Sequence, residues 1–162
     1  ADTAALRAWL AARDGAVLQL AAVAADPALD VAAHAVALDT AGAAWGAAGL
    51  MRSLPLFASQ GRSPFPASAR ASTGLRLEDL FAGRPTPALK ACLADLAGLA
   101  CSARGLKPGL NPDAFAAVAC AATAPLIATR MLALDDPLHL AARPAPLLTR
   151  LALLRAVIAG AL

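Results

Sequence analysis

The stretch WGAAGLMRSLPLFASQGRSPFP, residues 45–66, decides the fold, because its first half is typical of a helix end and its second half of a loop. The first half, with Gly46 and Gly49 among alanine and leucine, continues a helical pattern that begins after Asp30. Pro55 must break or kink this helix, since proline lacks an amide hydrogen and clashes with the preceding turn. The sequence therefore predicts one long helix from Asp30 to just before that proline, at about residue 54.

Three glycines in this helix share one face. Gly42, Gly46 and Gly49 stand at positions i, i+4 and i+7. A helix interior normally avoids glycine, because each one costs roughly 0.5–1 kcal/mol relative to alanine. We expect that the three glycines let a second helix approach closely, while a ligand-binding role for the same face stays open.

The composition favours an all-α protein. Alanine and leucine dominate and tyrosine is absent; alanine is the best helix former, whereas strands favour β-branched and aromatic residues. The chain of 162 residues is the size of one domain. Only 15% of its residues are charged and 59% are hydrophobic. We therefore expect much of the surface either to be alanine-rich or to be covered by a partner, a membrane or further chain.

Caps and prolines predict the other helices. Asp2 or Thr3 caps the first, and a threonine or asparagine followed by proline begins two later ones. We expect the most apolar of them, 113–134, to be the central core helix, kinked at Pro125. Cys92 and the other two cysteines are expected to be buried thiols in a reducing compartment. The expected helices are 3–25, 30–54, 75–81, 86–105, 113–134 and a last one after Pro146, with 59–74 as a loop.

Targeting and nucleic-acid signals are weak. The first ten residues carry an acid and a helix cap where a signal peptide has basic residues, so we do not expect export. The longest uncharged run, 114–129, has 16 residues, fewer than the ~18–20 of a membrane span. The net charge of +3 comes from scattered residues, and nucleic-acid binding normally needs a clustered basic stripe. We therefore expect no nucleic-acid partner.

Residues 45–66 resemble the second conserved block of the squalene/phytoene synthase family, which reads roughly L-Q-L-T-N-I-L-R-D-V-x-E-D-x-x-x-G-R-x-Y-L-P. The resemblance implies an isoprenoid-synthase-type helical bundle, in which 1–162 is a single domain equivalent to the C-terminal two thirds of the family fold. It also implies that 59–74 is the family's flap loop and that the family fold has more chain before Ala1. The matching positions are Leu50, Met51, Arg52, Gly61, Arg62, Phe65 and Pro66.

The positions that carry chemistry in that block differ here. The family aspartate falls on Ser53, the Glu-Asp pair falls on Leu56 and Phe57, and the polar Gln and Asn fall on Gly46 and Gly49. In active members the acids bind the magnesium ions that hold an isoprenoid diphosphate, and Mg²⁺ needs oxygen ligands. We therefore expect neither a metal site nor a catalytic residue. The degenerate pocket positions are Gly46, Gly49, Arg52, Ser53, Leu56, Phe57 and Arg62.

The resemblance favours a non-catalytic scaffold or assembly protein in a larger complex, similar to the silent branch of the family that includes an assembly factor of mitochondrial respiratory complex I. We expect a protein partner, with peripheral membrane or lipid contact as a further option. The expected location is the cytoplasm or the mitochondrial matrix, including the surface of the inner membrane. Two alternatives stay open: a magnesium-dependent prenyl-diphosphate transferase whose metal ligands precede Ala1, and an apolar-lipid-binding module.

Overall fold

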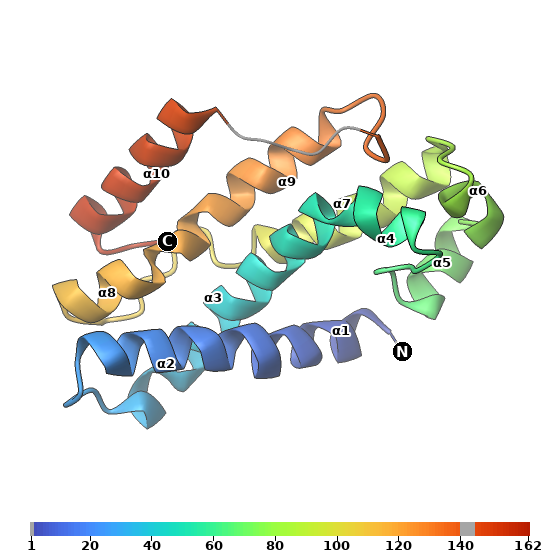
Figure 1. Ribbon diagram of the computed structural model, residues 1–162. Helices are drawn as coiled ribbons and strands as arrows, with labels where there is room; N and C mark the ends of the chain where they lie inside the picture. The colour runs from blue at the N-terminus through green and yellow to red at the C-terminus, as the bar shows by residue number, and fades with distance from the viewer. Residues whose placement is uncertain (1, 140–144) are drawn as a thin grey trace.

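The computed structural model describes residues 2–139 and 145–162, and in these ranges the chain is an all-α helical bundle (Figure 1). The expected all-α class is confirmed. The elements, in chain order, are α1 (Thr3–Leu10), η1 (Ala11–Gly15), α2 (Ala16–Ala25), α3 (Val31–Arg52), α4 (Leu54–Ser59), α5 (Ala67–Thr73), α6 (Leu77–Phe81), α7 (Pro87–Ala100), α8 (Pro112–Val118), η2 (Ala119–Thr123), α9 (Ala124–Leu132) and α10 (Pro146–Ala159).

The first predicted helix, 3–25, is present, but its middle is not a regular α-helix. Asp2 caps it by accepting a 2.7 Å hydrogen bond from the amide of Ala5. Between α1 and α2 the backbone widens into η1, a π-helical turn. Such a turn inserts one extra residue into the helix, and these insertions are frequent at functional sites.

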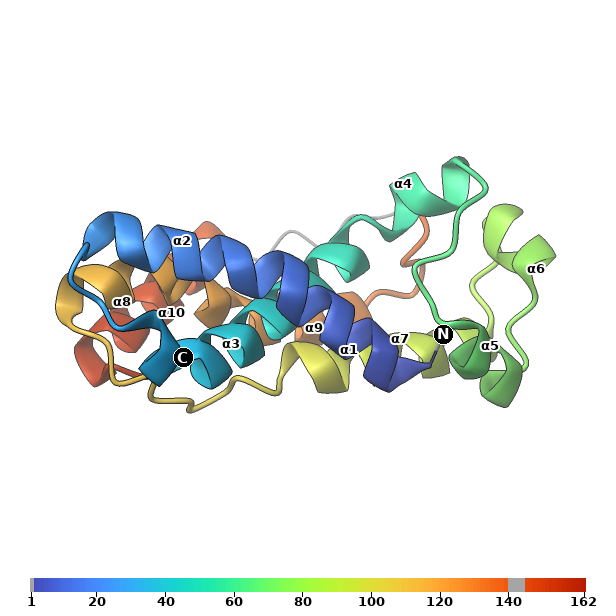
Figure 2. The same ribbon diagram turned by 90° about the horizontal axis from the view of Figure 1, so that it is seen from below.

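Helix α3 is the central element of the bundle. Asp30 caps it, as predicted, by accepting hydrogen bonds from the amides of Ala32 and Ala33. It packs against α1, η1, α2, α7 and α9, and Figure 2 shows α1 and α2 lying across it. The expectation that 113–134 would be the central helix is therefore wrong, because the alanine-rich side of α3 allows more neighbours to approach.

The expected loop 59–74 is only partly a loop. Pro55 ends α3 as predicted, but the chain resumes at once as α4, with the proline in its first turn, where its missing amide is not needed. Residues 67–73 then form α5, which ends at Gly74 with a φ of 72°. Alanine and serine in that helix permit helix formation, and packing against α7 stabilises it. The flap boundaries 59–74 are wrong in this respect.

The most apolar segment is divided where proline predicts. Helix α8 ends at Val118, η2 is a 3-10 helix, and α9 begins with Pro125 in its first turn. By length and hydropathy alone, the stretch Pro112–Leu132 could cross a membrane, contrary to the expectation from uncharged runs. Core helices of folded proteins also meet this criterion, and 44% of the most apolar window is buried inside the structure.

Alanine side chains make the centre of the core. Ala43, Ala44, Ala47 and Ala48 on α3 are completely buried. They face leucines of α1 and α7 and residues of α9, which join them in one apolar cluster. Small side chains let the helix axes approach closely, so the packing relies on backbone proximity more than on large side chains.

Asn111 links the start of α8 to the end of α2, and its loss should destabilise the fold. Its Oδ1 accepts a 2.8 Å hydrogen bond from the amide of Ala114, and its Nδ2 donates a 2.6 Å bond to Asp26 after α2. We expect Asn111→Ala to lower the free energy of unfolding by about 1–2 kcal/mol, measured by urea denaturation. Thr86→Ala removes only the cap of α7, so it should lower the free energy of unfolding by less than Asn111→Ala does. An equal cost for both would contradict a role for the contact with Asp26.

Candidate functional site

An ion pair between neighbouring residues marks the π-helical turn. The guanidinium Nη2 of Arg13 lies 2.7 Å from Oδ2 of Asp14, and Nε lies 3.2 Å from both carboxylate oxygens. Asp14 is only 8% exposed, and it is the one buried charged residue among 2–139 and 145–162. Buried charge is costly unless it is paired and hydrogen-bonded. Arg13 therefore makes the burial of this carboxylate possible.

The indole of Trp9 fixes the other side of Arg13. The guanidinium carbon lies 4.2 Å from the ring centroid, which is within the range of a cation–π contact. Trp9 is half exposed and Arg13 is partly exposed, so both form the outer rim of this group. The stack and the ion pair together hold the arginine against the turn.

Two glycines of α3 face the π-helical turn. A Cβ atom at Gly42 would collide with the backbone of Gly15, and one at Gly46 would collide with the carboxylate of Asp14 and with Leu10. The expected close approach of a second helix is thus confirmed for these two positions. For Gly49 it is wrong, because nothing lies within 4 Å of the place where its Cβ would stand.

A polar pocket opens beside the crossing of η1 and α3. Its volume is about 180 Å³, which is below the ~300–1,000 Å³ that is usual for small-molecule sites. Its charged lining groups are the Arg13–Asp14 pair and Arg52, so the pocket offers more donors than acceptors. The lining residues are Arg13, Asp14, Trp45, Gly46, Gly49, Arg52, Thr123 and Ile127.

Of the seven predicted pocket positions, only Gly46, Gly49 and Arg52 line this pocket. The remaining four are at the end of α3, on α4 and in the loop that follows. Ser53 is half-buried after the last turn of α3. Sequence reasoning had no positive signal for Trp45, Thr123 or Ile127.

The two apolar positions of the predicted site behave differently. Leu56 is 57% exposed, although it is an apolar residue close to the end of α3, where packing against the core would be expected. Phe57 does pack against the main core, and the guanidinium carbon of Arg62 lies 5.6 Å from its ring centroid. Because α4 begins immediately after α3, Leu56 and Phe57 lie outside the lining of the pocket.

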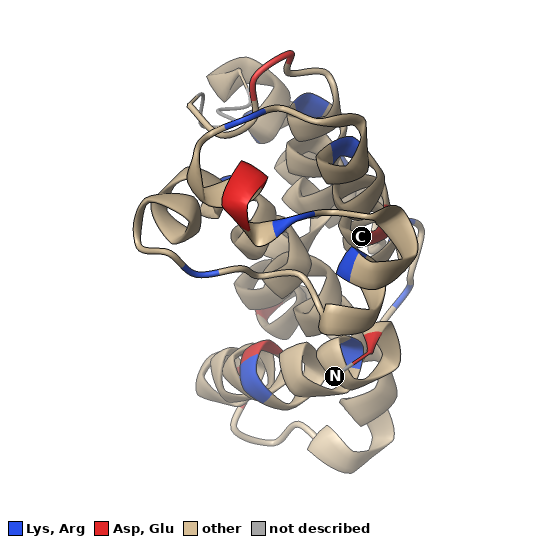
Figure 3. Ribbon diagram, turned by 90° about the vertical axis from the view of Figure 1, so that its right-hand side faces the viewer, with Lys and Arg blue, Asp and Glu red and all other residues tan. Residues whose placement is uncertain are grey.

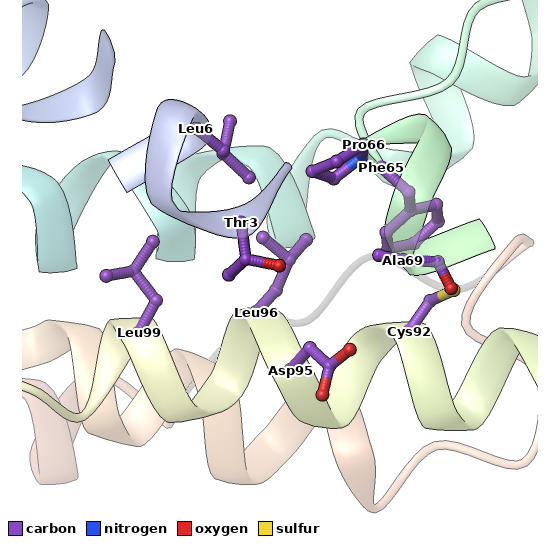
Figure 4. Close-up of a pocket in the computed structure, with 9 residues that line it drawn as sticks. All are labelled: Thr3, Leu6, Phe65, Pro66, Ala69, Cys92, Asp95, Leu96 and Leu99. Carbon is purple, nitrogen blue, oxygen red and sulfur yellow. The ribbon is translucent and has the colours of Figure 1, made fainter. Parts of the chain in front are cut away.

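The cysteines are free thiols in differing environments. Cys92 is buried, whereas Cys101 and Cys120 are half-buried, so the expected burial holds fully for one of the three. Figure 4 shows Cys92 in a small cavity under the start of α1, whose volume of about 10 Å³ is at most that of one water molecule. Burial raises the pKa of the Cys92 thiol, and a hydrogen bond with Thr73 partly opposes that rise. It therefore remains a neutral thiol near pH 7.

A third hollow lies between α4, the end of α6 and His139. The ring Nδ1 of His139 is 2.8 Å from Oδ2 of Asp136. Desolvation acts to raise the pKa of Asp136, but hydrogen bonds from His139 and from the amide of Leu138 outweigh it and lower that pKa. The hollow measures about 220 Å³ and is open along one side. Its polar groups are engaged locally, as expected for a turn.

Across the part of the chain that the structure describes, no three His, Cys, Asp or Glu side chains are grouped as metal ligands would be. Comparison with protein-family models, with curated proteins and with solved structures finds no match for this chain.

Alanine substitutions at the three glycines of α3 should affect stability differently, because Gly42 and Gly46 are in close contact with the π-helical turn and Gly49 is not. We expect Gly42→Ala to lower the free energy of unfolding by about 1–3 kcal/mol, because the added methyl group meets the backbone of Gly15 and pushes α3 away from the π-helical turn. Gly46→Ala should cost less, because its methyl group meets the side chains of Asp14 and Leu10. Gly49→Ala is the matched control. It should raise the free energy of unfolding by up to about 1 kcal/mol, because alanine has a higher helix propensity than glycine. Chemical denaturation monitored by circular dichroism measures all three. A Gly42→Ala variant of unchanged stability would contradict the close contact.

Proposed function

We propose that this protein is a non-catalytic scaffold or assembly protein that works within a larger complex. One observation carries the proposal: an exposed apolar surface on α10. Of thirteen exposed large apolar residues in the described ranges, six lie on this one helix of 14 residues. They are Leu147, Leu148, Leu151, Leu154, Val157 and Ile158.

Helix α10 is attached to the bundle by its other side. Ala156 is buried against α8 and η2, and Leu153 is partly buried beside it. Beyond the helix, the amide of Leu162 donates a 2.9 Å hydrogen bond to the carbonyl of Leu106, and the carbonyl of Leu162 accepts one from the amide of Gly105. Both faces of α10 are therefore apolar, but only one of them has a partner within the described chain.

A helix that is apolar all around is normally buried, and contiguous exposed apolar surface marks interaction sites. A protein partner fits this surface better than a lipid bilayer. Anionic membranes attract clusters of about 4–8 basic residues, whereas α10 carries only Arg150 and Arg155. Figure 3 shows the charged residues spread over a mostly neutral ribbon rather than gathered in one place.

The properties of the pocket also favour a scaffold function rather than prenyl-transferase activity. If the resemblance to squalene/phytoene synthases holds, the bundle is of the isoprenoid-synthase type and Arg52 lies in the remnant of the substrate pocket. That remnant is small, and its one carboxylate, Asp14, is already paired with Arg13. A volume of about 180 Å³ is likewise small for a prenyl chain or a stored lipid.

The test compares the native size of the tagged protein in extracts of its own cells with that of surface variants. We expect the wild type to migrate as a large assembly and Leu151→Glu to migrate as a monomer, because a charge in the apolar surface prevents docking. Val36→Glu is the control, since Val36 is an apolar residue that is 82% exposed on a different helix, α3. A monomeric wild type that condenses farnesyl or geranylgeranyl diphosphate with Mg²⁺ would overturn the proposal.

Restoring the family acids should not create a metal site. In the triple variant Ser53→Asp, Leu56→Glu and Phe57→Asp, the new carboxylates would lie outside the pocket lining. We expect no Mg²⁺ binding by calorimetry and a lower melting temperature. The loss of stability should come from Phe57, which packs on the core, because burying a carboxylate there is costly. Tight Mg²⁺ binding with unchanged stability would contradict this.

A further inference from the structure

We infer that the partner of α10 is a helix of a different protein, with an apolar seam flanked by acidic residues, and not a second copy of this chain. The inference rests on the proposed function, because it names the chemistry of the partner in that complex. It comes from the spacing of the exposed apolar residues and from the places of the two arginines beside them.

Four of the six exposed large apolar residues of α10 form one narrow stripe, and the other two, Leu148 and Val157, lie at its edges. Leu147, Leu151, Leu154 and Ile158 follow each other at intervals of four, three and four residues, and they are 67%, 51%, 57% and 77% exposed. This interval is the a/d repeat by which two helices interlock side chains in a coiled coil. The inner side of the helix, centred on Ala156, lies opposite the stripe and is already covered.

An arginine flanks the stripe on each side. With Leu151 and Ile158 at a, and Leu147 and Leu154 at d, Arg150 takes position g and Arg155 takes position e. Both are exposed, and neither forms an ion pair with any residue in 2–139 or 145–162. Residues at e and g of paired helices face each other across the seam, and their charges set partner choice and orientation.

These positions give a pair of two copies no ion pair in either orientation. In a parallel pair, g of one helix faces e of the next heptad in the other, so Arg150 would face the second copy's Arg155. Like charges across a seam destabilise this parallel pairing. In an antiparallel pair that overlaps the whole stripe, g faces g and e faces e, so Arg150 would face the second copy's Val157 and Arg155 its Leu148. Neither arginine would then gain a counter-ion. A helix with Glu or Asp at its e and g positions would instead form an ion pair with each arginine.

The first experiment uses the whole chain and two labelled helical peptides of three heptads. Both have Ile at a and Leu at d; one has Glu at every e and g position and the other has Lys. By fluorescence anisotropy we expect the Glu peptide to bind about tenfold or more tightly than the Lys peptide. The preference should reverse in the double variant Arg150→Glu, Arg155→Glu. Equal binding of both peptides would overturn the inference.

The second experiment measures self-association by sedimentation equilibrium. We expect the wild type to be monomeric and the single variant Arg150→Glu to dimerise, because the introduced carboxylate would then face the second copy's Arg155 in a parallel pair. Adding Leu151→Glu to that variant should abolish the dimer, and circular dichroism should show that all variants are folded. A wild-type dimer that Leu151→Glu dissociates would overturn the inference and identify a second copy as the occupant.

The native size of the assembly in cell extracts, measured for each variant, tests the proposed function and this inference separately. If Leu151→Glu releases the protein from its assembly and the double arginine variant also does, both stand. If only Leu151→Glu releases it, the scaffold role stands and the acidic partner is wrong. If neither does and the chain instead binds vesicles of anionic phospholipid through α10, the membrane is the occupant and both are wrong.

Discussion

The crossing of the π-helical turn over α3 is the contact on which the rest of the bundle depends. At this point Gly15 meets Gly42 backbone to backbone, and the carboxylate of Asp14 lies against Gly46. No side chain larger than hydrogen fits at Gly42, and one at Gly46 would have to displace the carboxylate of Asp14 and the side chain of Leu10. The distance between α3 and the α1–α2 helix sets the depth of the polar pocket, and it also determines whether Leu10 reaches the main core.

A carboxylate in such a tight crossing would normally oppose folding. Here its counter-ion comes from the adjacent residue of the same helix, so the segment from α1 to α2 docks on α3 with its charges already balanced. Arg13 remains partly in water and is held by Trp9, so only the carboxylate loses much of its hydration. The π-helical turn makes this possible because the additional residue changes the direction in which the two side chains leave the backbone.

Local signals predicted much of the fold. The caps at Asp30 and Asn111 and the prolines at 55 and 125 act within a single turn, so a sequence contains all that is needed to interpret them. Contacts between distant segments were predicted less well. The spacing of the glycines could not distinguish Gly46, which touches another helix, from Gly49, which faces the open pocket.

The candidate site was found only in part for the same reason. Arg52 was identified through a resemblance, but Trp45 and Thr123 come together only once α3 and η2 are packed, and no short pattern links them. Leu56 is apolar yet points to solvent, because its direction depends on where α4 begins. The unpaired side of α10 was also hidden in the sequence, since an apolar helix has the same composition whether a neighbour covers one side or both.

The alanine-rich core has a consequence for mutational scanning. Replacement of core residues by alanine is the usual way to rank packing contacts, and along the inner side of α3 it would change nothing, because Ala43, Ala44, Ala47 and Ala48 are already there. Their contribution would be invisible in such a scan. Only enlarging these side chains would show how little space they occupy, because overpacking forces the helices apart. At these four positions, substitution is therefore confined to the smallest residues.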